Sequence, residues 1–221
     1  MFIGHFGVGF ASKKIDERPS LGTMFIAAQF LDLLWPVLII FGIEKVQIVP
    51  DNPAFKTLDF ISYPYSHSLF LTLIWSMLFG LVYYSVKKNL KGSILLGALV
   101  LSHWILDLFT HVPDLPIFPW SDVKVGLGLW NSVPATIIIE GAIFAIGVYL
   151  YAKCTEAQNK KGSIGLWILA AFLVAVYLMS TFGSPPPSSD AIGYTGLSMW
   201  LIVAWGYWID RNRKSTSAAV E

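Results

Sequence analysis

The chain has 221 residues, of which 55% are hydrophobic and 13% are charged. An ordinary soluble domain carries about 25% charged residues, so this composition excludes a soluble globular protein and predicts a membrane protein that has lipids as partners. A net charge of +1, with the basic residues in short clusters at the ends of apolar runs, excludes a nucleic-acid partner.

The first apolar stretch, residues 1–11, is too short to cross a membrane, because a crossing helix needs roughly 20 residues. Its basic residues, Lys13 and Lys14, follow the stretch, whereas a secretory signal peptide places them before it, so we expect no cleavage. We expect a half-membrane helix that turns at the charged run 13–18 and returns through the next apolar segment. The N-terminus then lies inside the bundle.

The returning segment, residues 20–43, contains Gln29, Asp32 and Pro36. We expect it to cross with a kink at Pro36, since proline removes a helix hydrogen bond and clashes with the preceding turn. The sequence therefore predicts an all-α fold, a polytopic membrane helical bundle of about six transmembrane helices plus the short N-terminal helix. The other five apolar segments are residues 64–86, 92–112, 133–153, 163–183 and 192–209.

Lys and Arg residues are divided unevenly between the two sides of this bundle. The positive-inside rule places the richer side in the cytoplasm, so we expect both termini on the cytoplasmic side of the cell's inner membrane. We expect one integral membrane domain over residues 1–214 and a disordered polar tail over residues 215–221. The poorer side holds three basic residues, and the richer side holds twelve: Lys13, Lys14, Arg18, Lys87, Lys88, Lys91, Lys153, Lys160, Lys161, Arg211, Arg213 and Lys214.

Ionisable residues inside the apolar segments are the main candidates for chemistry, because a charge at membrane depth is costly and is usually paired inside the protein. His103 and Asp107 are four residues apart and lie on one helix face, and His111 continues that face. A nitrogen ligand beside a carboxylate suits a divalent metal such as zinc. The single cysteine, Cys154, excludes a thiolate cluster.

Further candidates come from the other segments at similar depth. Asp32 lies near the middle of segment 20–43, His67 near the outer end of segment 64–86, and Glu140 near the same side of segment 133–153. His5 reaches the same depth if the N-terminal helix is tucked into the bundle. All four histidines of the chain then converge on one cavity in the outer half of the membrane, which predicts a metal site. Glu140 is alternatively an interhelical hydrogen-bonding residue, and Asp114 we expect to be a solvated loop carboxylate.

The order of these residues resembles that of a known family. His5 in an apolar N-terminal segment, Asp32 in the next helix, Ser66-His67-Ser68 and the His103-x-x-x-Asp107 motif are similar to the membrane-bound metal-dependent hydrolases of the bacterial YdjM type. The resemblance covers residues 1–150, which therefore contain the metal site.

The same order of residues is similar to that of the zinc-dependent phospholipase C and single-strand-specific nuclease superfamily. This resemblance implies that Asp32, His67, His103 and Asp107 bind one zinc ion and that His5 binds a second ion sharing Asp107. The soluble enzymes have further ligands beyond the position of His111, and no histidine follows it here. The resemblance thus implies one or two divalent metal ions.

These residues predict a metal-dependent hydrolase acting on an amphiphilic, phosphate-containing substrate such as a phospholipid or a polyprenyl phosphate. Asp32 or Glu140 would accept a proton from the attacking water, and His111 would protonate the leaving group. The alternative is a transporter or ion pathway, because intramembrane His, Asp and Glu also form proton relays and ion routes. A third possibility is a structural membrane protein with a few buried hydrogen-bonded pairs.

Overall fold

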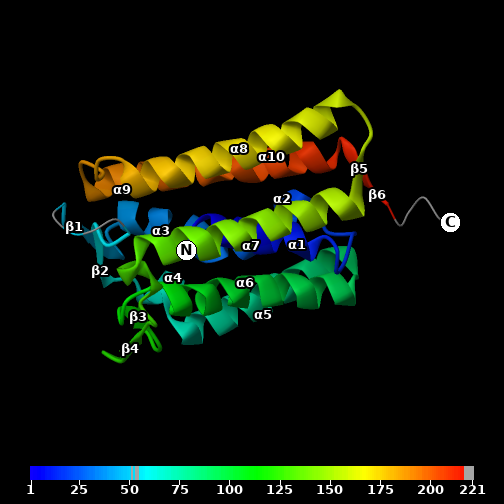
Figure 1. Cartoon of the computed structure of the whole chain (residues 1–221). Helices are drawn as coiled ribbons and strands as arrows, with labels where there is room; N and C mark the ends of the chain where they lie inside the picture. Colours follow the sequence, from blue (N-terminus) through cyan, green and yellow to red (C-terminus); the bar gives the residue numbers. More distant parts are fainter. Residues whose placement is uncertain (51, 53–54, 217–221) are drawn as a thin grey trace.

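Long helices running side by side form the body of the protein in a computed structural model that describes residues 1–50, 52 and 55–216 (Figure 1). A 3-10 turn, η1 (Leu129–Asn131), precedes α7. The α-helices are α1 (Ile3–Ser12), α2 (Leu21–Ala28), α3 (Phe30–Ile40), α4 (Pro64–His67), α5 (Leu69–Lys87), α6 (Leu90–Thr110), α7 (Val133–Cys154), α8 (Lys160–Phe182), α9 (Ser189–Leu197) and α10 (Met199–Asp210).

Four helices of the described chain, α5, α6, α7 and α8, are long and apolar enough to cross a membrane, with mean hydropathy from 1.7 to 2.2. The bent pair of α2 and α3 makes a fifth if it is counted as one span. The last expected crossing, residues 192–209, is divided at Ser198 into α9 and α10. The chain is therefore a helical membrane protein with four or five such spans, and the count of six stays a prediction.

The N-terminal helix α1 has 10 residues and is buried among the longer helices. Its length of about 15 Å at 1.5 Å per residue is half of a hydrocarbon core. Phe6 and Phe10 are fully buried in the main hydrophobic core. The backbones of α1 and α7 are in direct contact, because a Cβ atom at Gly147 of α7 would overlap the carbonyl oxygen of Gly7 of α1. Small residues permit this close approach of two helices in a membrane.

The segment returning from α1 bends at Gln29, and the kink expected at Pro36 is wrong. The axes of α2 and α3 differ by 60° across the single residue Gln29, whereas Pro36 lies inside the continuous helix α3. Because α2 ends at Ala28, its last carbonyl groups lack helical partners. The Ala28 carbonyl instead accepts a hydrogen bond from the ring of His103, which gives the bend a role in the site.

Within the described residues, three short antiparallel sheets of two strands each connect the helices, and the all-α expectation missed them. The pairs are β1 (Lys45–Ile48) with β2 (Leu58–Ser62), β3 (Leu115–Pro116) with β4 (Lys124–Val125), and β5 (Thr155–Ala157) with β6 (Arg213–Ser215). We call the end that carries the first two sheets the hairpin end (Figure 1). Ser215, which we expected in a disordered tail, pairs with Thr155 in the third sheet, and residues 217–221 of that tail lie outside the described residues.

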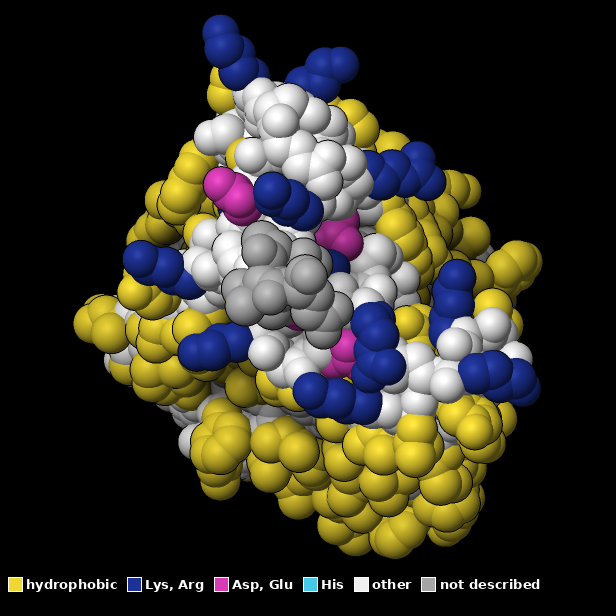
Figure 2. Space-filling model, turned by 90° about the vertical axis from the view of Figure 1, so that its right-hand side faces the viewer, with side chains coloured by type: hydrophobic (Ala, Val, Ile, Leu, Met, Phe, Trp, Pro, Cys, Tyr) yellow, Lys and Arg dark blue, Asp and Glu magenta, His cyan; other side chains and the backbone are white. Residues whose placement is uncertain are grey.

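Basic side chains gather around the opposite end of the molecule, at β5 and β6 (Figure 2). We call it the basic end. The expected cytoplasmic Lys and Arg residues flank the helix ends that meet there. Several are held by acidic partners: Lys13 Nζ lies 2.8 Å from Asp210 Oδ2, and Arg18 Nε lies 2.9 Å from Asp16 Oδ1. The fold thus places the twelve basic residues expected on the cytoplasmic side at the basic end, away from the three expected on the other side.

Candidate metal centre

Four helices bring His5, Asp32, His67, His103 and Asp107 together, although these residues are far apart in the sequence. His5 comes from α1, Asp32 from the first turn of α3, and His67 from the end of α4. His103 and Asp107 lie one turn apart on α6. Apart from Asp32, whose side chain is 24% exposed, all of them are buried.

Four donor atoms form the first cluster: Asp32 Oδ1, His67 Nε2, His103 Nε2 and Asp107 Oδ2. His67 lies 3.4 Å from Asp32 and 3.9 Å from Asp107. His103 lies 3.6 Å from Asp32 and 3.2 Å from Asp107. Ligands of a tetrahedral zinc ion are separated by about 3.4 Å, given metal–ligand bonds of about 2.0–2.1 Å. The spacing and chemistry of these donors therefore fit one divalent metal ion.

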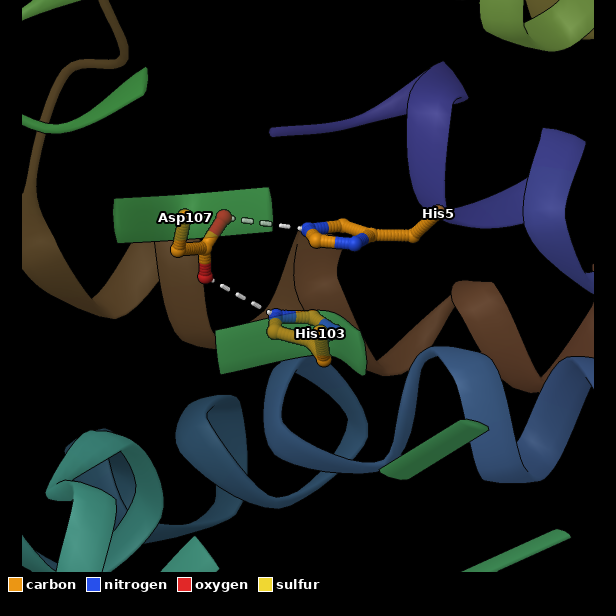
Figure 3. Close-up of side chains that lie close together, drawn as sticks. All are labelled: His5, His103 and Asp107. Carbon is orange, nitrogen blue, oxygen red and sulfur yellow. Dashed lines mark hydrogen bonds and ion pairs between the residues drawn. The ribbon is translucent and has the colours of Figure 1, made fainter. Parts of the chain in front are cut away.

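A second cluster shares His103 and Asp107 with the first and adds His5. One carboxylate oxygen of Asp107 faces His5 and the other faces His103 (Figure 3). His5 Nε2 lies 3.1 Å from Asp107 Oδ1, and its ring stacks on that of His103 with centroids 3.6 Å apart. The Met1 amino group lies 2.6 Å from the same oxygen of Asp107. Asp107 is thus positioned between two groups of nitrogen donors.

The ring of His103 is oriented by the bend between α2 and α3. Its Nδ1 lies 2.8 Å from the Ala28 carbonyl oxygen, which can only accept, so Nδ1 carries the hydrogen. The opposite nitrogen, Nε2, is buried and makes no hydrogen bond within the described residues. In the neutral ring the Nε2 lone pair faces two carboxylates, an arrangement that a bound cation stabilises, whereas a protonated ring pairs with Asp107 at 3.2 Å.

His67 is oriented in the same manner by Ser66, which the sequence analysis named only as part of a motif, and by Glu44, which it missed. The Ser66 hydroxyl donates to Glu44 Oε2 at 2.6 Å, and it therefore accepts from His67 Nδ1 at 2.7 Å. Glu44 is 1% exposed and also accepts from the backbone amides of Tyr65 and Ser66. The hydrogen bonds from Glu44 through Ser66 to His67 direct the Nε2 lone pair of His67 toward Asp32. They also make this nitrogen a stronger metal ligand.

Glu140 lies beside the clusters and holds the start of α1. Its Oε2 accepts from the Phe2 amide at 2.8 Å and the Gly4 amide at 3.4 Å. A carboxylate at a helix N-terminus satisfies amides that lack helical partners. This carboxylate therefore positions the helix that carries His5, which is the hydrogen-bonding role left open for it, and its catalytic role stays a prediction.

His111 is in neither cluster, so the structure does not bring it together with the other three histidines as a shared ligand. Its Nδ1 donates to Asp114 Oδ1 at 2.9 Å, and Tyr63 donates to the same oxygen at 3.2 Å. Burial, together with the nearby negative charge of Asp114, raises the pKa of Tyr63 well above its usual value. Asp114 is half-buried and paired, contrary to the solvated carboxylate that we expected.

A cavity of about 830 Å³ connects these residues with apolar side chains of the C-terminal helices. Asp32, His67 and Asp107 line it, and so do Glu140 and His111. Its other walls come from α3, α8, α9 and α10 and from the loop 183–186. A group that enters this cavity therefore reaches Asp32, His67 and Asp107 of the first cluster, and it also reaches Glu140 and His111.

Comparison with known proteins assigns the chain to one family. No curated protein and no solved structure matches it. The family model described as YdjM inner membrane protein matches residues 55–186, a range that contains His67, His103, Asp107, His111 and Glu140 and begins after His5 and Asp32. Since this range is more than half of the chain, the protein belongs to the YdjM inner membrane protein family.

Proposed function

We propose that this protein is a membrane-embedded, metal-dependent hydrolase that cleaves a phosphoester bond of a lipid or another amphiphile. The observation that carries the proposal is that Asp32, His67, His103 and Asp107 lie close together and that three of them line a largely apolar cavity. Zinc is the metal that this set of two nitrogen and two oxygen donors suits. We also propose that the chain crosses the inner membrane six times and has both termini in the cytoplasm.

The metal, when bound, would supply Lewis-acid activation of a water molecule and of a phosphoryl oxygen. The chain's own residues supply the proton transfers. Asp32 is the most exposed donor of the cluster and lines the cavity, so its carboxylate can accept a proton from the water. His111 lines the same cavity, oriented by Asp114, and is placed to protonate the leaving oxygen.

The metal is tested first, by elemental mass spectrometry of the purified protein. We expect about one or two divalent ions per chain, and fewer after Asp107→Asn, because a weakened ligand costs affinity. The control is Asp210→Asn, a partly buried carboxylate that is bound by Lys13 and Tyr151 at the basic end. A metal content near zero after supplementation, or an equal loss in the control, would exclude the site.

Catalysis is tested by reconstituting the protein and screening phospholipids and polyprenyl phosphates for released head group or phosphate. Glu140→Gln keeps an oxygen that can accept from the Phe2 and Gly4 amides. If Glu140 is the base, this variant should retain metal and lose about 10² to 10⁴-fold in rate. Metal-dependent ion flux across sealed vesicles, with no product from any lipid, would favour the transporter instead.

A further inference from the structure

The cavity extends well beyond the proposed metal ligands, and α8, α9 and α10 line it with mostly apolar side chains. We propose that this part of the cavity, formed by α8, α9 and α10, binds the hydrocarbon tail of an anionic lipid that enters sideways from the bilayer between α8 and α10. The proposal rests on the proposed function for the position of the head group. The tail site itself is argued from the lining of the cavity.

The lining of the cavity is of two kinds. Ionisable side chains come from the candidate metal centre and from Glu140 and His111 beside it, while α8 and α10 supply Phe172, Ile202 and Trp205. A volume of about 830 Å³ is within the range of known ligand sites, roughly 300–1,000 Å³. An amphiphile matches such a cavity, because its phosphate reaches the ionisable side chains while its tail is removed from polar groups.

The depth of the two kinds of lining matches one leaflet of a bilayer. Asp107 lies within one turn of Thr110, where α6 ends at the hairpin end of the bundle. Phe172 lies ten residues before Phe182, where α8 ends at the same end, which places Phe172 about 15 Å from that end along a straight helix and about 10 Å deeper than Asp107. Half of a hydrocarbon core is about 15 Å. A lipid with its head at Asp107 therefore has its tail beside Phe172 near the bilayer midplane.

The proposed lateral opening lies where α8 and α10 face each other. Phe172 and Leu201 line the cavity and are 43% and 72% exposed. Phe172 contacts Trp205 across the gap, with ring centroids 5.8 Å apart. Trp205 also lines a second groove, together with Ile164 and Ile168 of α8. Trp205 is thus shared by the lining of the cavity and the lining of this groove, whose other residues include Lys160 and Lys161 at the start of α8.

Photo-crosslinking tests the tail site directly in protein reconstituted in bilayers. The two probes are a phosphatidic acid and a polyprenyl phosphate, each with a diazirine at the end of its tail, and labelled peptides are mapped by mass spectrometry. The labels are expected on the segments that contain Phe172 and Trp205. Comparison of the probes shows which class of lipid phosphate the site prefers.

A matched pair of variants on α8 separates the cavity from the lipid-facing surface. Val176 is half-buried and lines the cavity, whereas Val174 is 37% exposed and is not part of its lining. Val176→Trp should lower labelling of the cavity segments by about tenfold or more, because an indole fills the space of the tail. Val174→Trp should leave labelling unchanged, and both variants should retain metal.

The outcomes distinguish the tail site from the proposed function. Equal labelling of wild type and Val176→Trp, or labelling spread evenly over the lipid-facing helices, would overturn the tail site even if metal-dependent turnover is found. Labelling confined to the cavity and lost in Val176→Trp would support the tail site even if no lipid is hydrolysed.

Discussion

Ser66 and Ser68 lie on either side of His67 and make different contacts. Ser66 links the His67 ring to Glu44, with its hydroxyl between the two side chains. Ser68 caps helix α5, where its hydroxyl accepts from the Leu71 amide at 3.4 Å. A change at one position should therefore affect the metal site, and the same change at the other should affect only the helix.

Ser66→Ala is expected to weaken metal binding by about 10 to 100-fold, because it removes the partner that orients His67. Ser68→Ala should leave metal affinity unchanged and lower the free energy of unfolding by about 1 kcal/mol, the usual cost of a lost helix cap. Titration against a competing chelator measures the first quantity, and thermal unfolding measures the second. Equal metal affinity in the two variants would contradict the positioning role of Ser66.

The residues that converge on the candidate site were largely predictable from the sequence, because buried ionisable groups in apolar segments are few. Helical spacing alone places His103 and Asp107 on one face of α6. Glu44 was not predictable, since it follows α3 beside Lys45 and resembles an ordinary loop carboxylate until the fold buries it. Tyr63 was missed for a similar reason: an aromatic residue before a proline gives no signal of a buried hydroxyl.

At the scale of elements, the contact of α1 with α7 controls whether His5 reaches the site. Gly147→Ala should lower the free energy of unfolding by about 1–3 kcal/mol, because the added methyl group overlaps the backbone of α1 and displaces it. Any metal ion that depends on His5 should be lost with it. Thermal unfolding and metal content measured on the same preparation check both effects.

Gly141→Ala on the same helix is the matched control, since nothing lies within 4 Å of a Cβ atom there. Alanine is the better helix former by about 1 kcal/mol, so this variant should be as stable as the wild type or more stable. Destabilisation of both variants to the same extent would show that α7 tolerates no substitution and that the contact with α1 is not the cause.

Hydropathy and length predicted the long helices well, because a crossing segment must be continuously apolar. They did not predict the break at Gln29, where the Ala28 carbonyl accepts a hydrogen bond from His103 of α6, far along the chain. The strands were missed because they are short and lie in polar connections: β3 and β4 have only two residues each. Such pairings depend on how the helix ends are spaced, which the sequence alone does not show.

At the scale of the whole molecule, the separation of basic residues between the two ends predicts the orientation in the membrane. Reporter fusions after Lys91, Lys161 and Lys214 are expected to read cytoplasmic, and fusions after Asp122 and Ser188 to read external. The candidate metal centre would then face the external leaflet. A C-terminal fusion that reads external would reverse this orientation and, with it, the leaflet from which the lipid enters.

The burial of α1 against α7 also has a consequence for biosynthesis. Gly7 is synthesised well before its partner Gly147, and at about 5–20 residues per second the interval is on the order of ten seconds. A 10-residue helix is too short to be inserted as a span of its own, so it has no stable position until α6 and α7 are in the membrane. The docking of α1 against α7 therefore follows the insertion of α7, and the packing that positions His5 is complete only then.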